Sequence, residues 1–221
     1  MQTELFSPDP DGSHCEALAL NEDSLQIWRD AFDTDCATTL MDQLLADIPW
    51  RQEYLWIGGQ KRAVPRLQCW MGDRGSHYGY SGMRLRPEPW QDAVQQIRSR
   101  VESLCSQQFN SVLLNLYRDG QDSVSWHADD EAELGLWPVI ASVSLGAERQ
   151  FQFKPKTPAS RCSHRFVLPA GSLLLMGEGI QNRWLHQLPK VKDLKEPRIN
   201  LTFRRIVGST ANSEAASHPD G

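Results

Sequence analysis

Three residues in the second half of the chain have the types and the spacing that a metal site needs. His127 and Asp129 stand two positions apart, and His186 follows in the separate run Trp184-Leu185-His186. Two imidazoles and one carboxylate on one face of ferrous iron leave the opposite positions open for a co-substrate and for oxygen. The triad therefore predicts an iron oxygenase. The alternative is a surface hydrogen-bonded pair of His127 and Asp129, with His186 as an unrelated buried histidine.

Extended backbone must carry His127 and Asp129, because residues two apart on a strand point to the same face. Residues 111–117 are rich in β-branched, aromatic and aliphatic side chains, Asp119-Gly120 supplies a turn, and residues 123–126 resume the extended pattern. We therefore expect a strand, a turn and a second strand that carries both ligands.

A run near the C-terminal end, residues 197–205, offers two cations. Strand alternation puts its apolar residues on one face and its polar residues on the other, namely Arg198, Asn200, Thr202 and Arg204. The planar fork of arginine binds carboxylates through two hydrogen bonds, so two such forks near a metal suit a dicarboxylic co-substrate. The alternative is an amphipathic edge strand whose arginines face solvent.

These motifs occur together with others in a characteristic order. They include Val64-Pro65-Arg66, Tyr80-Ser81-Gly82, residues 115–120, residues 141–146, residues 171–176 and His186-Gln187-Leu188-Pro189. From about Val64 to Ile206 the chain resembles the AlkB family of iron(II)- and 2-oxoglutarate-dependent dioxygenases that repair alkylated nucleic acid. It is most similar to the subgroup typified by the animal enzyme that acts on double-stranded DNA. Residues 1–50 match only loosely.

The resemblance implies a set of ligands and a reaction. His127, Asp129 and His186 would bind Fe(II), and 2-oxoglutarate and O2 would be the co-substrates. The residues implied to bind 2-oxoglutarate are Asn115, Tyr117, Arg198, Asn200 and Arg204, with Arg198 on its distal carboxylate and Arg204 near its keto-acid end. The implied reaction is oxidative demethylation of N-alkylated bases of the 1-methyladenine and 3-methylcytosine type in DNA. It releases formaldehyde, succinate and CO2 and repairs alkylation damage.

A methylated base inside a duplex cannot reach such a site, so the substrate must be single-stranded or the nucleotide must be flipped out. By the resemblance, Tyr80 stacks on the flipped base, and Tyr78 alternates with it along the strand. Glu131 matches an acidic position that reads the exocyclic amine, and a carboxylate favours a base made cationic by methylation. Arg66 would orient acidic side chains near Glu131 or touch nucleic acid. The alternative for the tyrosines is ordinary packing in the core or on the surface.

Residues 54–60 read as a strand that enters a hairpin tip at Gly58-Gly59, followed by Lys61 and Arg62. In the duplex-acting subgroup, a hairpin at this place inserts an apolar finger into the base stack. The resemblance therefore makes Ile57, with Gly58 beside it, the candidate duplex wedge. The alternative is a plain surface hairpin.

The charges of the chain are unevenly distributed. The whole chain holds 23 basic and 28 acidic residues, but residues 1–50 hold eleven of the acidic residues and only one basic residue, Arg29. The remainder therefore carries 22 basic and 17 acidic residues. Because phosphate binding depends on local positive surface, the net charge does not exclude a nucleic-acid partner.

Two helical patterns precede a series of short strands. Thr34 is expected to cap a helix with Leu40, Met41, Leu44 and Leu45. Pro89 is expected to lie in the first turn of a second helix, with Val94, Ile97, Val101 and Leu104 at helical spacing. Strands with turn signals follow from Val112 onward. This order predicts a mostly β protein with flanking α: a double-stranded β-helix (jelly roll) with helices packed on one sheet.

The chain length and the 40% of apolar residues suit one domain with a sizeable core. We expect residues 1–23 to be a flexible acidic tail, residues 24–208 a single dioxygenase domain, and residues 209–221 a second flexible tail. Within the domain, residues of about 50–90 would recognise the nucleotide, and residues of about 110–206 would form the jelly-roll core.

Five cysteines without a C-x-x-C pair, no secretion signal and no long apolar run favour a reduced, cytoplasmic protein, or a nuclear one in a eukaryote. We expect a monomer with no membrane partner. Two other classes of function stay open. One is a related dioxygenase that acts on RNA or on protein, and the other is a non-catalytic jelly-roll binding module.

Overall fold

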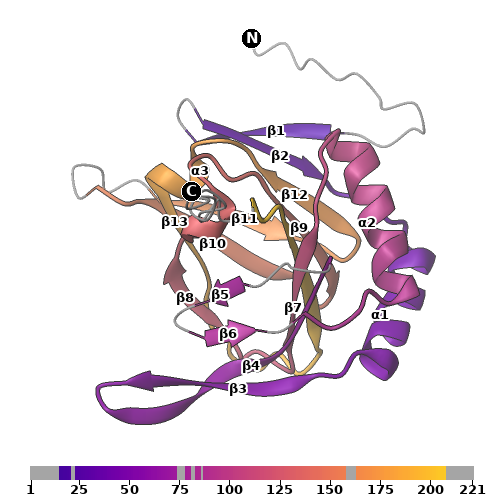
Figure 1. Ribbon diagram of the computed structural model, residues 1–221. Coiled ribbons are helices and arrows are strands. Elements are labelled where there is room, and N and C mark those ends of the chain that lie inside the picture. Colours follow the sequence, from indigo (N-terminus) through magenta and orange to yellow (C-terminus); the bar gives the residue numbers. More distant parts are fainter. Residues whose placement is uncertain are drawn as a thin grey trace, which may run out of the picture.

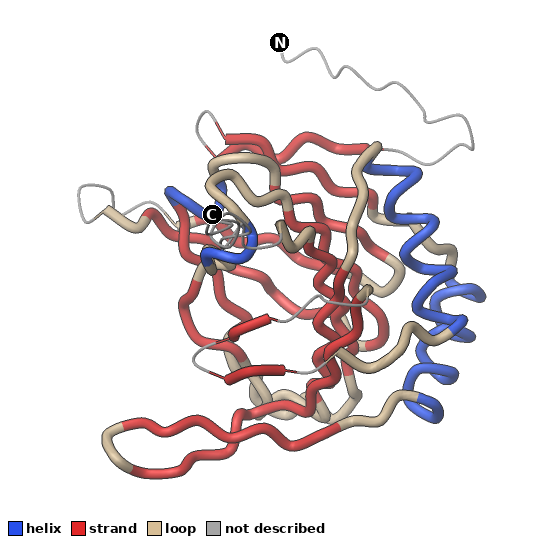
Figure 2. Tube along the Cα trace, in the orientation of Figure 1, coloured by secondary structure: helices blue, strands red, loops and turns tan. Residues whose placement is uncertain are grey.

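The computed structural model describes residues 15–20, 23–73, 78–80, 83–85, 87–157 and 163–207. In this part of the chain, two antiparallel sheets face each other, and two helices cover the outer face of the larger one (Figure 1, Figure 2). This is the expected double-stranded β-helix with helices on one sheet.

The larger sheet has eight strands within the described residues. Their spatial order is β1 (Cys15–Leu20), β2 (Asp23–Trp28), β12 (Ser172–Met176), β9 (Ile140–Gly146), β14 (Arg198–Arg204), β7 (Ser111–Tyr117), β4 (Gln60–Gly72) and β3 (Arg51–Ile57). The smaller sheet consists of β11 (His164–Leu168), β10 (Arg149–Pro155), β13 (Trp184–Leu188) and β8 (Val124–His127). A separate two-stranded ribbon is formed by β5 (Tyr78–Tyr80) and β6 (Met83–Leu85).

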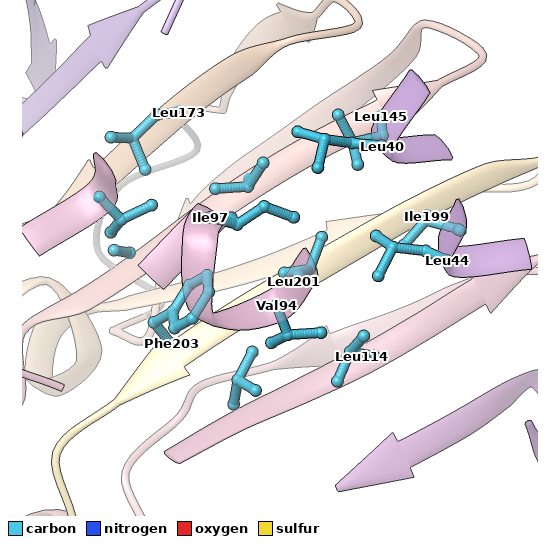
Figure 3. Close-up of a cluster of buried hydrophobic side chains, with 14 of the residues drawn as sticks. Leu40, Leu44, Val94, Ile97, Leu114, Leu145, Leu173, Ile199, Leu201 and Phe203 are labelled. Carbon is cyan, nitrogen blue, oxygen red and sulfur yellow. The ribbon is translucent and has the colours of Figure 1, made fainter. Parts of the chain in front are cut away.

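The helices are α1 (Thr34–Asp47), α2 (Asp92–Cys105) and the short α3 (Ile180–Arg183), with a 3-10 turn, η1, at Ala132–Leu134. The buried residues of α1 and α2 recur at three- and four-residue spacing, which gives each helix one apolar stripe. Figure 3 shows Leu44 of α1 and Val94 of α2 packed over Leu114, Ile199 and Leu201 of the sheet. These contacts bury the apolar face of the larger sheet under the two helices.

Strand β14 has one apolar face and one polar face. Its odd-numbered residues lie in the apolar layer under the helices, and its even-numbered polar residues, from Arg198 to Arg204, line a cavity between the two sheets. A second apolar cluster fills the space between the sheets around this cavity, with Leu113, Phe151, Phe153 and Leu174 among its members. The alternation expected for residues 197–205 is confirmed.

The start of each long helix differs from the expectation. The cap of α1 is Asp33, whose Oδ1 accepts a hydrogen bond from the backbone N–H of Cys36 at 2.8 Å, and Thr34 is the first helical residue. Pro89 does not lie in the first turn of α2, which begins at Asp92. The reason is a contact with a distant part of the chain. The Glu88 N–H donates to the Trp70 carbonyl at 2.8 Å, so the segment just before Pro89 lies along β4 and the helix starts later.

The expected boundary of the N-terminal tail is also wrong in part. Residues 15–20 form β1, which pairs residue by residue with β2, and β2 pairs with β12 of the jelly roll. Leu20 is fully buried in the cluster between the sheets, so burial of apolar surface stabilises this strand. Residues 1–14 and 208–221 lie outside the described residues.

Within the described chain, no helix combines the length and the apolar character needed to cross a membrane.

Candidate active site

The three predicted ligands come together at one end of the cavity. Each of His127, Asp129 and His186 offers a ligand atom, and these atoms all lie within 4.8 Å of one another. His127 and His186 are direct cross-strand neighbours on β8 and β13, with ring centroids 4.2 Å apart. Asp129 departs from the expectation, because β8 ends at His127 and the aspartate follows in irregular backbone.

Both histidines are held in the neutral form that can bind a metal. The Nδ1 atom of His127 lies 2.8 Å from the carbonyl oxygen of Ser125, which favours a proton on Nδ1 and leaves the lone pair of Nε2 available. Burial is the main cause that lowers the pKa of His127. Burial, and then the neighbouring His127, lower the pKa of His186 to about 3. Neutral imidazoles at physiological pH are ready ligands.

Asp129 is ionised in spite of its burial. Burial by itself raises the pKa of this carboxyl, but Arg204 and the two imidazoles outweigh it and bring the pKa to about 2. The Arg204 Nη2 donates to Asp129 Oδ1 at 2.8 Å, and both side chains are almost fully buried. The backbone N–H of Asp129 donates to Oε1 of Gln181 at 2.9 Å.

This donor set fits ferrous iron. Two neutral nitrogens and one carboxylate oxygen are the ligand types of the facial triad, and the buried Nδ1 of His186 has no hydrogen-bond partner among the described residues. His127, Asp129 and His186 would hold the ion, which would supply open positions for a co-substrate and oxygen.

The cavity beside the triad has a volume of about 450 Å³, including the solvent at its mouth. Arg198 lines it, is almost fully buried, and makes no ion pair with any residue that the structure describes. Its Nη2 donates to Ser144 Oγ at 2.8 Å, while its Nε has no hydrogen-bond partner in the described chain. Burial lowers the pKa of Arg198 to about 10, so the group stays charged at neutral pH. A buried cation without an anion is costly, which is the arrangement expected of a carboxylate-binding site.

Asn115 and Tyr117 reach the same cavity from β7. The Arg198 guanidinium carbon lies 5.4 Å from the centroid of the Tyr117 ring. The Asn115 Oδ1 accepts hydrogen bonds from Arg66 Nε at 2.8 Å and from Gln68 Nε2 at 2.9 Å. Since both donors engage the oxygen, Nδ2 of Asn115 is the atom that can donate to a bound carboxylate.

Asn200 also lines the cavity, but its amide bonds to the protein. Its Nδ2 donates to Ser142 Oγ at 2.8 Å and to the Val143 carbonyl at 3.0 Å, and its Oδ1 accepts from Thr202 Oγ1 at 2.9 Å. In this arrangement Asn200 orders the cavity wall instead of offering a donor to a co-substrate.

The expected base-binding residues are described to different extents. Arg66 is buried, lines the cavity and is joined to Asn115, which places it beside the expected co-substrate residues. Glu131 is half-buried and lies directly before η1. Tyr78 and Tyr80 both lie on β5, two residues apart as expected, but their side chains are outside the described residues.

The expected hairpin is formed by β3 and β4, which turn at Gly58 and Gly59 with φ angles of 58° and 76°. In Figure 1 it projects at the lower left beyond the two sheets. Two aromatic side chains, Tyr54 and Trp56, are 44% and 74% exposed, and Lys61 Nζ lies 4.4 Å from the centroid of the Tyr54 ring. The Ile57 side chain lies outside the described residues.

Sequence reasoning missed four residues that shape the site: Gln68, Ser142, Ser144 and Gln181. Ser142 and Ser144 alternate within an otherwise apolar buried strand, and that pattern is a usable signal for side chains that face a polar cavity. Gln68 and Gln181 are single polar residues in segments that mix polar and apolar side chains, so the sequence gives no such signal at these positions.

Arg149 was also missed, and it connects the loops that carry the site. Its guanidinium donates to the carbonyls of Asp119 and Asp122 at 3.3 Å and 3.1 Å and to that of Pro189 at 2.6 Å. It thereby ties the connection between β7 and β8 to the residue that follows β13. The link therefore joins the segments next to the two strands that carry the histidines.

Known proteins share these features. Residues 24–204 match the 2OG-Fe(II) oxygenase superfamily. DNA oxidative demethylase ALKBH2 of Bos taurus is 44% identical over 162 residues, which cover 70% of this chain and 58% of that protein. DNA oxidative demethylase ALKBH2 of Mus musculus is 37% identical over 204 residues, which cover 90% of this chain and 85% of that protein. The match to the bovine protein therefore spans less than two thirds of its length.

The solved structure of OsALKBH1 has the same fold, with a TM-score of 0.57 and 16% sequence identity, over 82% of this chain and 97% of that chain. The matched region, from residue 24 to residue 204, contains all three predicted ligands and the three arginines that line the cavity, Arg66, Arg198 and Arg204. The chain therefore belongs to the 2OG-Fe(II) oxygenase superfamily and, within it, to the AlkB family, in the group that includes ALKBH2.

Proposed function

We propose that this protein is an Fe(II)- and 2-oxoglutarate-dependent dioxygenase that demethylates N-alkylated bases of the 1-methyladenine and 3-methylcytosine type in DNA. The products would be formaldehyde, succinate, CO2 and the repaired base. The observation that carries the proposal is the juxtaposition of the His127, Asp129 and His186 triad with the buried Arg198, which has no anionic partner in the described chain. A metal site and a carboxylate site in one cavity are what this reaction needs.

The residues of the chain bind and orient, while bound iron supplies the oxidative chemistry. Arg198, whose Nη2 donates to Ser144 Oγ, would hold the distal carboxylate of 2-oxoglutarate. Asn115 contributes the donor that its two partners leave available, and Tyr117 covers the Arg198 guanidinium. Arg204 orients Asp129 and adds positive charge at the end of the cavity nearest the triad, where the keto-acid group would lie.

The choice of a DNA base rests on several features of the chain. Two relatives that carry the name DNA oxidative demethylase are 44% and 37% identical to it. A flipped base needs an aromatic surface to stack on and a polar group that hydrogen-bonds to its edge. We assign the aromatic surface to Tyr78 and Tyr80 and the polar group to Glu131. Arg66, through its bond to Asn115, would join the base side of the cavity to the co-substrate side.

The hairpin of β3 and β4 is our candidate for contact with the strand around the damaged base. Tyr54 and Trp56 expose aromatic surface next to Lys61, and base stacking on aromatics combined with cations on phosphates is how single strands are bound. Gly58 is exposed at the tip and has no side chain to insert, so the wedge role remains with Ile57.

Two alternatives of different class remain testable. A dioxygenase that acts on RNA or on protein would keep the iron and 2-oxoglutarate sites but would not demethylate DNA. A non-catalytic jelly-roll module would bind ligands without turnover. A monomer in the cytoplasm, or in the nucleus of a eukaryote, is the state in which we expect the DNA-repair enzyme to act.

The experiment begins without oxygen. Addition of Fe(II) and 2-oxoglutarate should give the visible charge-transfer band of the complex, and Asp129→Ala should abolish it. Air and methylated oligonucleotides are then added, and formaldehyde is measured for single-stranded DNA, duplex DNA and RNA of one sequence. Formaldehyde from DNA supports the proposal. A band without formaldehyde from any DNA would favour the RNA or protein alternative, and absence of the band would favour the binding module.

A further inference from the structure

The backbone of Asp129 is not held by the sheet that holds the two histidines. His127 and His186 face each other across β8 and β13, but β8 ends at His127 and the pairing between the strands shifts beyond His186. Asp129 is buried, and its N–H therefore needs a partner outside the ladder.

Gln181 provides that partner. Its side chain is fully buried, its Oε1 accepts from the Asp129 N–H at 2.9 Å, and its Nε2 lies 3.4 Å from Met176 Sδ. Because the Asp129 group is a donor, only the amide oxygen of Gln181 can bond to it, and this fixes the orientation of the amide. A thioether is a weak acceptor, so the strong contact of the buried amide is the one to Asp129.

The location of Gln181 links two ligands. It lies on α3, and β13, which carries His186, begins directly after that helix. The carboxylate of Asp129 is held separately by Arg204. The ligand is therefore held at two points: Arg204 fixes a carboxylate oxygen, and Gln181 fixes the backbone from which the side chain projects.

We propose that Gln181 is a positioning residue of the metal site: it holds the backbone of Asp129 so that the carboxylate meets the two imidazoles. This rests on the proposed function only in requiring that the triad binds a divalent metal. Partners that orient metal ligands in this way typically contribute 10- to 100-fold to metal affinity.

The test is an anaerobic titration of the full chain with Co(II) alone, followed by its visible absorption band and by calorimetry. Gln181→Met keeps the size of the side chain and removes the acceptor. We expect its Kd for Co(II) to rise at least about tenfold and its absorption band to change in position or intensity. The matched control is Asn182→Ala, which alters the exposed neighbour on α3 and should bind Co(II) like the unmodified protein. Equal Kd values and bands for Gln181→Met and the unmodified protein would overturn the inference.

A second measurement needs no variant and does not depend on how Gln181→Met folds. In the unmodified, metal-free protein, the Asp129 amide should exchange with deuterium as slowly as the amides of β13. Exchange as fast as that of an exposed loop amide would contradict the inference.

The two proposals can fail separately. If the protein binds Co(II) but releases no formaldehyde from methylated nucleic acid, the proposed function fails while Gln181 is still tested by the titration. If it demethylates DNA but Gln181→Met binds Co(II) normally, only the role of Gln181 fails.

Discussion

Arg198 is the residue that most clearly distinguishes this site from a structural metal site. It is a buried cation. Within the part of the protein that the structure describes, its Nε has no hydrogen-bond acceptor and its charge has no anionic partner. Such a group destabilises the empty protein and stabilises a complex with an anion. Its effects on folding and on binding should therefore have opposite signs.

Arg198→Met should raise the KM for 2-oxoglutarate by about tenfold to a hundredfold, because a charge-assisted hydrogen bond contributes about 1.5–3 kcal/mol. The same variant without metal or co-substrate should unfold at a temperature no lower than the unmodified protein. Steady-state kinetics and thermal unfolding measure the two effects. Arg165→Met, at an exposed position on β11, is the control and should leave both unchanged. An unchanged KM in Arg198→Met would show that Arg198 does not bind the co-substrate.

Asp122 shows how a single ion pair holds the loop that leads to β8. Its carboxylate accepts hydrogen bonds from Arg118 through Nε, Nη2 and the backbone N–H, at 2.7, 2.8 and 2.9 Å. Burial raises the pKa of Asp122, but these bonds outweigh it and the pKa is lowered overall. The carboxylate thus stabilises the fold above the pKa of an unfolded aspartate, and the contribution is lost as the pH falls through the lowered pKa.

Asp122→Asn should therefore be less stable than the unmodified protein at pH 7, and the difference should shrink in acid, below the usual aspartate pKa of about 4. Denaturant unfolding at several pH values measures it. A difference that stays constant down to pH 3 would show that the charge of Asp122 is not what stabilises the loop.

The β3–β4 hairpin is the element whose role is most open to a direct test. Trp56→Ala should weaken binding of a methylated single strand by about 1–3 kcal/mol, which is the usual contribution of one stacked base. Turnover of a free methylated nucleoside, which is too small to reach the hairpin, should be unchanged.

Trp137→Ala is the matched control for the hairpin, because that tryptophan is also exposed but lies between η1 and β9. Equal losses of affinity in the two variants, measured by fluorescence anisotropy, would mean that the hairpin has no special role.

The elements also show what the sequence can and cannot predict. Alternation placed Arg198 and Arg204 on the cavity side of β14, because a strand that is apolar on one face has only one way to bury it. The position of Asp129 beyond the end of β8 had no local signal, since it depends on Gln181 and Arg204 from distant elements. The same holds for β1, which exists because β2 and the jelly roll lie beside it.

The molecule as a whole has an acidic N-terminal part and a basic remainder, and its co-substrate cavity lies between the two sheets. Binding of a polyanion to a surface weakens as salt rises, because counterions are released on binding. Binding of 2-oxoglutarate by buried groups is screened much less.

Raising the salt concentration from 50 to 200 mM should thus increase the KM for a methylated oligonucleotide several-fold, as expected for a few phosphate contacts. The KM for 2-oxoglutarate should change little over the same range. Kinetics at several salt concentrations measure both constants. A parallel rise of the two would place the co-substrate site at the exposed surface, against the buried position of Arg198.

The central claim is that one cavity couples 2-oxoglutarate to removal of a methyl group from a DNA base. The most direct test is mass spectrometry of an oligonucleotide with one 1-methyladenine after incubation with the protein, Fe(II), 2-oxoglutarate and air. We predict conversion to unmodified adenine with succinate formed alongside, and no conversion by Asp129→Ala or without 2-oxoglutarate. An unchanged oligonucleotide, while the protein still forms succinate, would contradict the claim.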